Sequence, residues 1–337
     1  MKTHQDIESF NQWSDFDKDQ YSISVIKGLV MDATRKANSG HPGGPLSCAD
    51  FAYVLYKHYL KFDPENPNWF NRDRFVLSGG HMSMVQYALL LFIGWLKLED
   101  IKKFRQLNSN TPGHPEVEIP GVECTTGPLG QGFAMATGMA HGEAYLRNIF
   151  TNRSIKASNL VDHYTYVLAS DGDLQEPVAL GSASLAGHLG LSKLIVFYDA
   201  NEAQISGNTN RSDSTDYKKI FDGFNWHVQE INGHNHDEIK TSIESAQKEN
   251  RPSIIIGNTI MAKELLAWRV ITIRMELHSL KKRLIDLSRN LDFQMKNFII
   301  LMKSKNIFNS DFLNFLPWSL YGMMKRINWY LHKILLP

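Results

Sequence analysis

Hydrophobic residues along the chain follow two alternating spacings. Apolar residues three or four positions apart predict helices over 21–38, 47–60, 82–95, 98–106, 130–150, 176–189 and 237–248. Short uninterrupted apolar runs predict strands over 74–77, 166–169, 194–198, 226–231 and 253–256. Strands that alternate with helices indicate an α/β fold with a doubly wound, mainly parallel sheet flanked by helices. Ser47 is the expected cap of the second helix.

The segment 164–201 carries the clearest chemical signal, because two predicted strands in it end on oxygen-bearing side chains. The first strand leads to Asp171 and Gly172, and the second leads to Asn201. Ligands bind beyond the carboxyl ends of parallel strands, and carboxylate and amide oxygens suit a Mg²⁺ or Ca²⁺ ion that carries a phosphorylated cofactor. Asp, Asn and Gly are also common turn residues, so this segment alone fits an ordinary turn equally well.

The overall composition is that of a soluble globular protein. The chain has 337 residues, enough for one large or two ordinary domains, and its net charge of +1 gives no sign of a nucleic-acid-binding surface. Two cysteines argue against a disulfide framework and fit a reducing compartment. The sequence shows neither a secretory leader nor an apolar run of the roughly 18 residues that a membrane span needs. We therefore expect a cytoplasmic protein.

The composition changes after Lys263. Residues 264–337 contain 12 Lys and Arg against 5 Asp and Glu, whereas the preceding residues contain 24 basic and 30 acidic side chains. Only Gly322, of the 23 glycines, lies in this last segment. These differences predict a folded domain over 1–263 and an atypical basic tail over 264–337 that is not a native domain.

Three histidines stand beside glycine or proline in predicted loops. They are His41, His81 and His114. A loop imidazole can donate a hydrogen bond to a phosphate or a sugar hydroxyl, although a single loop histidine is often only solvated. Their spacing matches no zinc pattern. His234 and His236 flank a polar turn, so we expect these two side chains to lie in solvent.

A glycine-rich loop over 125–132 precedes the predicted helix 130–150. Its glycines would let backbone groups approach a flat ring or a phosphate. A Gly-Pro turn before a helix explains the same residues without any ligand, so this pattern alone is weak.

The order of the motifs is more specific than any one of them. The motifs are Gly-His-Pro-Gly-Gly-Pro at 40–45, Leu-Ser-Gly-Gly-His at 77–81, Thr-Pro-Gly-His-Pro-Glu at 111–116, Thr-Thr-Gly-Pro-Leu-Gly-Gln-Gly at 125–132, Asp-Gly-Asp-Leu-Gln-Glu at 171–176 and Tyr-Asp-Ala-Asn at 198–201. This succession resembles the N-terminal, diphosphate-binding domain of the transketolase family over about residues 21–263. The resemblance implies a thiamine-diphosphate-binding fold and a cofactor pair of thiamine diphosphate with Mg²⁺, or with Ca²⁺ or another divalent cation.

The resemblance also implies roles for individual residues. Asp171, the Asn201 side chain and the backbone carbonyl of Ala203 would ligate the metal. The Gly172 amide and His81 would contact the diphosphate. The residues expected at the aminopyrimidine ring are Gly127, Pro128 and Leu129, and those expected at the ketose substrate are His41 and His114. Glu176 resembles an acidic residue that lies near the dimer interface of the family.

Three positions depart from the family pattern. Ser170 and Pro177 stand where the family usually has glycine, and Ala203 replaces a larger aliphatic residue. A serine adds a Cβ beside the diphosphate, whereas proline is tolerated at a helix start and a backbone ligand survives a change of side chain. We expect these changes to weaken cofactor binding without abolishing it.

The family reaction moves a two-carbon ketol unit between sugar phosphates in the pentose phosphate pathway of carbohydrate metabolism. The glutamate that pairs with the aminopyrimidine, and the arginines that bind phosphate, belong to a middle domain that nothing after Lys263 resembles. The expected partners are therefore sugar phosphates and a second transketolase-type chain or C-terminal subunit, with no nucleic acid and no membrane. The alternatives are an inactive remnant that at most binds thiamine diphosphate and Mg²⁺, or a related thiamine enzyme.

The change after Lys263 has two explanations. If the Arg274 codon ends in C, moving the reading frame back by one base turns the codons for 274–280 into a segment that begins His-Gly, of the kind that the family carries there. We therefore predict a one-base shift between about residues 263 and 274. The rival explanation is a naturally split transketolase whose N-terminal half is a separate subunit.

Overall fold

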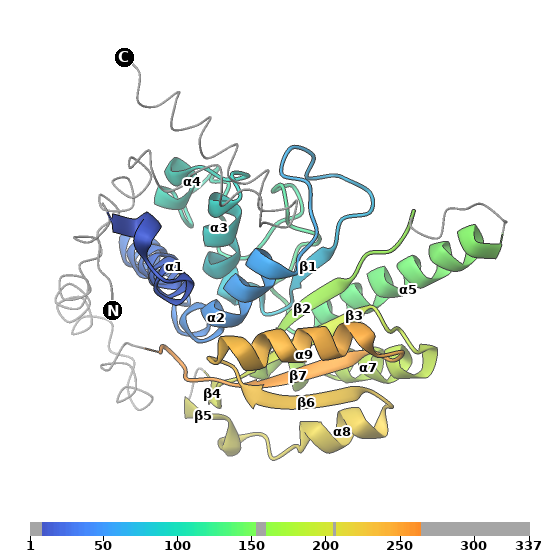
Figure 1. Cartoon of the computed structure of the whole chain (residues 1–337). Helices are drawn as coiled ribbons and strands as arrows, with labels where there is room; N and C mark the ends of the chain where they lie inside the picture. The colour runs from blue at the N-terminus through green and yellow to red at the C-terminus, as the bar shows by residue number, and fades with distance from the viewer. Residues whose placement is uncertain (1–8, 153–159, 205–206, 264–337) are drawn as a thin grey trace.

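A five-stranded parallel sheet forms the centre of the molecule (Figure 1). The computed structural model describes residues 9–152, 160–204 and 207–263. The strands, in their order across the sheet, are β1 (Arg74–Leu77), β2 (Thr165–Ser170), β3 (Leu194–Ala200), β7 (Ser253–Asn258) and β6 (His227–Asn232). Every neighbouring pair runs parallel. A short antiparallel pair, β4 (Ala203–Gln204) and β5 (Gly207–Asn208), follows β3.

Helices cover both faces of the sheet, as the sequence predicts (Figure 1). The first face carries α1 (Asp15–Ala37), α2 (Gly43–His58), α3 (Ser83–Phe92) and α9 (His236–Lys248), with α4 (Leu98–Lys102) packed against α1 and α3. The second face carries α5 (Gln131–Asn152), α7 (Pro177–Leu189) and α8 (Tyr217–Gly223). The step from β6 to β7 runs across the sheet in the opposite direction to the other steps, so a right-handed crossover brings α9 to the opposite face from α7 and α8.

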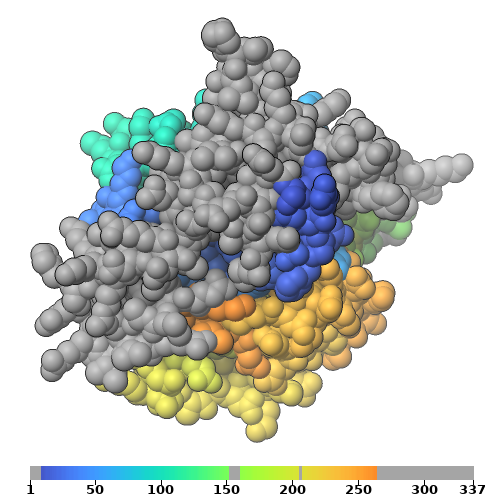
Figure 2. Space-filling view, turned by 60° about the vertical axis from the view of Figure 1, so that its left-hand side comes forward, coloured from blue at the N-terminus to red at the C-terminus, as the bar shows by residue number. Residues whose placement is uncertain are grey.

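Short helical turns complete the described part of the chain. They are α6 (Asp171–Leu174) and the 3₁₀ turns η2 (Gly80–Met82) and η3 (Thr209–Arg211). In the space-filling view of Figure 2, the blue surface of α1 lies directly beside the gold and orange surface formed by segment 207–263.

The strand register explains the two cores. Residues that are partners across the sheet share one face, and alternate rows point to opposite faces. One row faces α1 to α3 and consists of Leu77, Leu168, Phe197 and Ile255; the row that faces α5 and α7 consists of Val76, Val167, Val196 and Ile254. These strands are apolar on both faces because each face is covered, which is why they read as continuous apolar runs in the sequence.

The predicted first residues of two helices differ from those in the structure, because the residues that cap the helices set where they begin. The first helix begins at Asp15 rather than 21, because the Ser14 hydroxyl oxygen accepts a hydrogen bond from the Asp17 amide at 3.1 Å. The second begins at Gly43, so the prediction that Ser47 is its cap was wrong. Ser47 lies inside the helix instead. Helix α8 and the β4–β5 pair were not predicted at all.

No helix within the described ranges is long and apolar enough to cross a membrane. The basic tail 264–337 and the proposed frameshift lie outside the described residues, which end at Lys263.

Candidate functional site

Three loops meet at the carboxyl edge of the sheet around the buried side chain of Asp173. Its Oδ1 accepts hydrogen bonds from the Ser78 hydroxyl at 2.7 Å and from the Gly130 amide at 2.8 Å. Its Oδ2 accepts from the amide and the hydroxyl of Ser170, at 2.9 and 2.8 Å. Asp173 therefore joins the loop after β1, the start of α5 and the end of β2. No role was predicted for Asp173 from the sequence, although it is the second acid of the motif at 171–176.

Asp171 lies in the same turn and has one carboxylate oxygen without a partner. Its Oδ1 accepts a hydrogen bond from the Tyr198 hydroxyl at 2.6 Å. Its Oδ2 is buried and, within the part of the chain that the structure describes, has no hydrogen-bond partner. Burial, reinforced by the nearby charge of Asp199, raises the pKa of Asp171 to about 7. A buried carboxylate oxygen that accepts no hydrogen bond lacks the positively charged partner that would stabilise its ionised form.

Asn201 and Ala203 lie next to this carboxylate, at the end of the neighbouring strand. The register pairs Ser170 with Asp199, so the residues that follow each strand emerge side by side. Asn201 Oδ1 accepts a hydrogen bond from the Ala203 amide at 3.1 Å, and its Nδ2 donates to Asp199 Oδ2 at 2.8 Å. The structure thus brings the three predicted metal ligands to one edge of the sheet.

The available donors suit a hard divalent cation. Among the described residues there is no cluster of three or more His, Cys, Asp and Glu side chains that could hold a metal. A site here would combine one carboxylate, one amide oxygen and one backbone carbonyl, with water or ligand oxygens completing the set, which is typical of Mg²⁺ or Ca²⁺. The unpartnered Oδ2 of Asp171 fits such an ion, because a cation would give this oxygen the partner it lacks.

Two further buried polar atoms near this edge have no hydrogen-bond partner in the described ranges. They are Thr126 Oγ1, in the loop before α5, and Gln175 Nε2, at the end of α6. Native structures rarely leave such atoms unsatisfied. Both atoms lie on segments that Asp173 joins, so both are available to bind a polar ligand at this edge.

The three predicted histidines come together. The ring centroid of His41 lies 5.4 Å from that of His81 and 6.4 Å from that of His114. Burial, the neighbouring imidazoles and the Arg105 guanidinium lower the pKa of His41 to about 4. Burial likewise lowers the pKa of His81 and of His114. All three rings are therefore neutral near pH 7, and each can donate one hydrogen bond and accept another.

The glycine-rich loop packs against the histidine loops. A Cβ on Gly80 would lie 2.7 Å from the Gly127 amide, and a Cβ on Gly127 would lie 3.3 Å from the His114 ring. Gly127 also has φ = +153°, which disfavours any side chain. Leu129 approaches Gly172, since a Cβ there would lie 2.8 Å from Leu129 Cδ1. The loop of Gly127, Pro128 and Leu129 is therefore held between His114 and the turn that carries Asp171.

Glu176 and Pro177 begin α7. Glu176 is the N-cap residue and Pro177 occupies the first helical turn, where a proline costs no hydrogen bond. The Glu176 side chain also packs on Gly130, whose Cβ position lies 2.7 Å from Glu176 Cβ. The Pro177 departure is accordingly compatible with the helix.

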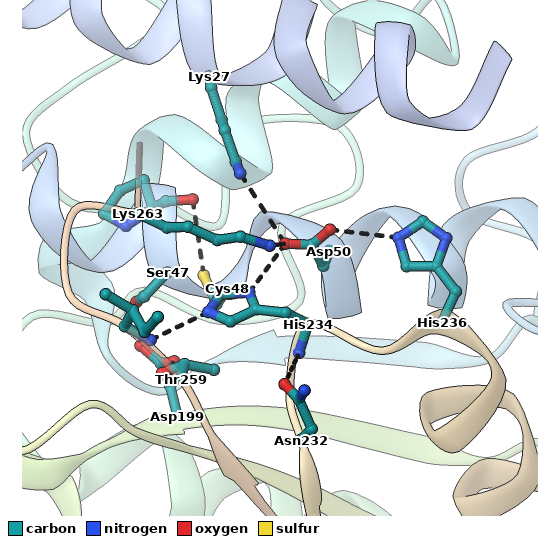
Figure 3. Close-up of polar contacts among 12 residues, drawn as sticks. Lys27, Ser47, Cys48, Asp50, Asp199, Asn232, His234, His236, Thr259 and Lys263 are labelled. Atoms are coloured by element: carbon teal, nitrogen blue, oxygen red, sulfur yellow. Dashed lines mark hydrogen bonds and ion pairs between the residues drawn. The ribbon is translucent and has the colours of Figure 1, made fainter. Parts of the chain in front are cut away.

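The prediction that His234 and His236 lie in solvent was wrong. His234 Nδ1 lies 3.0 Å from Asp50 Oδ2 and His236 Nε2 lies 3.2 Å from Asp50 Oδ1 (Figure 3). The Ile260 amide donates to His234 Nε2 at 3.0 Å, so Nδ1 carries the proton that is donated to Asp50. Lys263 also reaches Asp50, at 3.4 Å. Asp50 comes from α2, far away in the sequence, and a turn pattern could not reveal it.

This network holds the chain after β7 against α2. Burial alone would raise the pKa of Asp50, but the two histidine donors, with Lys27 and Lys263, hold it well below its usual range. The Ala262 amide also donates to the Gly43 carbonyl at 3.2 Å, at the start of α2. The segment 259–263 is therefore fixed beside the helix that follows His41.

Residues 18–266 match a family model described as "Transketolase, thiamine diphosphate binding domain". The chain is 48% identical over 247 residues to a transketolase of Staphylococcus epidermidis, covering 73% of this chain and 37% of that protein. It is 50% identical over 242 residues to a transketolase of Buchnera aphidicola, covering 71% of this chain and 36% of that protein. The chain thus spans little more than a third of the length of the curated relatives it matches.

Solved structures of transketolases are also similar to this chain. The chain is similar to a crystal structure of transketolase from Campylobacter jejuni, with a TM-score of 0.75 and 36% identity over 93% of this chain and 48% of that one. It is also similar to a transketolase mutant from Pichia stipitis, with a TM-score of 0.71 and 34% identity over 84% of this chain and 46% of that one.

Proposed function

Because the chain belongs to the transketolase family, through the thiamine diphosphate binding domain that residues 18–266 match, we propose that it anchors the diphosphate end of thiamine diphosphate through a divalent cation. The family predicted from the motif order and the α/β fold predicted from the alternation of strands and helices are confirmed. Asp171, Asn201 and the Ala203 carbonyl are the proposed ligands of the cation, which we take to be Mg²⁺. Gly172 and His81 are the proposed contacts of the diphosphate.

The observation that carries this proposal is the unpartnered, buried Oδ2 of Asp171. The oxygen lies at the carboxyl edge of a parallel sheet, where ligands of such folds bind. A buried carboxylate without a cationic partner is costly, and no described side chain supplies one here. Asp171 would hold such a cation, and the cation would neutralise the charge of a bound diphosphate.

The histidine cluster supports a role in sugar phosphate chemistry. When bound, thiamine diphosphate supplies carbanion chemistry that protein side chains lack. His41 and His114 are neutral, so they can hold or move a proton at a substrate hydroxyl. We assign them to ketol transfer between sugar phosphates, with Gly127, Pro128 and Leu129 placed to meet the aminopyrimidine ring.

We propose that a second chain completes the site. The chain matches about 37% of the length of a full relative, so the residues that the rest of that relative supplies would come from the second chain. Glu176 lies at the start of α7 and is proposed to face the partner. A cytoplasmic role in the pentose phosphate pathway is proposed from the family alone. An inactive, cofactor-binding remnant remains the second candidate, because the proposed anchor needs no other domain.

Ketol transfer assays separate these two candidates. The purified chain with Mg²⁺ and thiamine diphosphate is expected to show no transfer, because it spans too little of the full enzyme. Mixing it with a separately expressed C-terminal part of a relative should restore transfer, and His114→Asn in this chain should lower the restored rate. Transfer by the chain alone would contradict the incomplete half-site, and binding without any restoration would favour the remnant.

A further inference from the structure

A buried carboxylate that the proposed cation site does not use lies directly behind Asn201. We propose that Asp199 is a positioning residue, which holds the Asn201 amide so that its oxygen faces the cation. This inference rests on the proposed function, because it takes Asn201 to be a cation ligand. Asp199 itself is fully buried and belongs to the end of β3.

The hydrogen bonds define which way the Asn201 amide points. Asn201 Nδ2 donates a hydrogen bond to Asp199 Oδ2 at 2.8 Å. The other atom, Oδ1, accepts from the Ala203 amide at 3.1 Å, which requires an oxygen. Both contacts therefore select the same orientation. A rotated amide would set oxygen against carboxylate and NH₂ against N–H, and would present nitrogen to the cation.

Asp199 can impose this orientation because it is itself fixed from two other directions. The Ser47 hydroxyl in α2 lies 2.5 Å from its Oδ2, and the Thr259 hydroxyl after β7 lies 2.5 Å from its Oδ1. Figure 3 shows Ser47, Thr259 and Asp199 gathered beneath α2. The carboxylate thus ties the end of β3 to the helix that follows His41 and to the segment that follows β7. A side chain anchored in this way loses little entropy when it orients a neighbour.

A double-mutant cycle on metal affinity tests this role. Mn²⁺ binding is measured by the EPR signal of free Mn²⁺, with thiamine diphosphate present and a protein-free blank subtracted. Asp199→Ala is expected to weaken Mn²⁺ binding about 10- to 100-fold, the range typical of residues that orient ligands, and Asn201→Ala, which removes the ligand itself, at least as much. Combined, they should weaken it no more than Asn201→Ala alone, since Asp199 acts through Asn201.

Asp199→Asn provides the conservative rescue. The oxygen of the new amide can accept hydrogen bonds from Asn201 and Ser47, and its NH₂ group can donate one to the Thr259 hydroxyl oxygen. Mn²⁺ affinity close to wild type is therefore expected, together with a similar melting temperature. If Asp199→Ala does not fold, Asp199→Ser replaces it in the double-mutant cycle, because serine is too short to hydrogen-bond to Asn201.

The outcomes separate this inference from the function on which it rests. Unchanged Mn²⁺ binding by Asn201→Ala would remove the ligand assignment and this inference with it. If Asn201→Ala weakens Mn²⁺ binding and the double variant weakens it by the product of the two single effects, the ligand assignment stands and the inference about Asp199 is overturned. Loss of affinity in Asp199→Asn as large as in Asp199→Ala would overturn it as well.

Discussion

Replacing Asp171 by Asn is expected to reduce Mg²⁺-dependent binding of thiamine diphosphate by at least about 100-fold, since changes one shell further out already cost 10- to 100-fold. The Tyr198 hydroxyl donates to Oδ1 at 2.6 Å, so it will retain the amide oxygen of the variant at that position. The NH₂ group then replaces the unpartnered Oδ2 and points at the cation. Both the charge and the oxygen ligand are lost. Calorimetry with thiamine diphosphate and Mg²⁺ measures the change.

The variant should remain folded, which separates lost binding from lost structure. Burial raises the pKa of Asp171 to about 7, so a neutral amide suits the cation-free protein at least as well as the carboxylate does. We expect a melting temperature equal to or above that of the wild type. Asp222→Asn, on the exposed surface of α8, is the matched control and should change neither property. Unchanged cofactor binding by Asp171→Asn would refute the ligand assignment.

Replacing Gly187 by Ala is expected to destabilise the domain by about 3 kcal/mol, at the upper end for overpacked sites. A Cβ at this position of α7 would lie 1.8 Å from the Phe224 carbonyl oxygen and 3.2 Å from Trp226 Cδ1. The first contact is with backbone, so no side-chain rotation relieves it. Either α7 moves away from the end of α8, or the Trp226 packing is lost. Urea denaturation followed by Trp fluorescence measures the free energy of unfolding.

Gly181→Ala is the matched control in the same helix. A Cβ there meets no atom within 4 Å, so only the helix preference of alanine changes. This variant should gain roughly 0.5–1 kcal/mol of stability. Equal effects of the two substitutions would show that the close contact of α7 with the end of α8 does not limit stability.

The sequence predicts the sheet better than the helix ends. Strand β1 begins and ends at the predicted residues. A continuous apolar run of four residues is too short for a helix, so its length favours a buried strand. The start of α1 was placed too late, since the polar turn that begins at Asp15 depends on the Ser14 cap rather than on apolar spacing. Helix α8 escaped prediction because its seven residues are too few to show a period.

The site was predictable where its residues stand in recognisable loops. His41, His81 and His114 were expected at one site, and their rings do lie together. Asp173 and Asp199 were missed, because a buried carboxylate is defined by donors that come from distant segments. Asp199, for example, is bound by Ser47, which lies 152 positions earlier in the chain. No local pattern contains such a contact.

The central claim is that this chain holds the diphosphate end of thiamine diphosphate through a divalent cation. Calorimetric titration of the purified chain with thiamine diphosphate, with and without Mg²⁺, tests it most directly. We predict saturable binding that requires Mg²⁺, and no binding of thiamine, which lacks the diphosphate that the cation would carry. Binding that ignores Mg²⁺, equal binding of thiamine, or no binding at millimolar cofactor would contradict the claim.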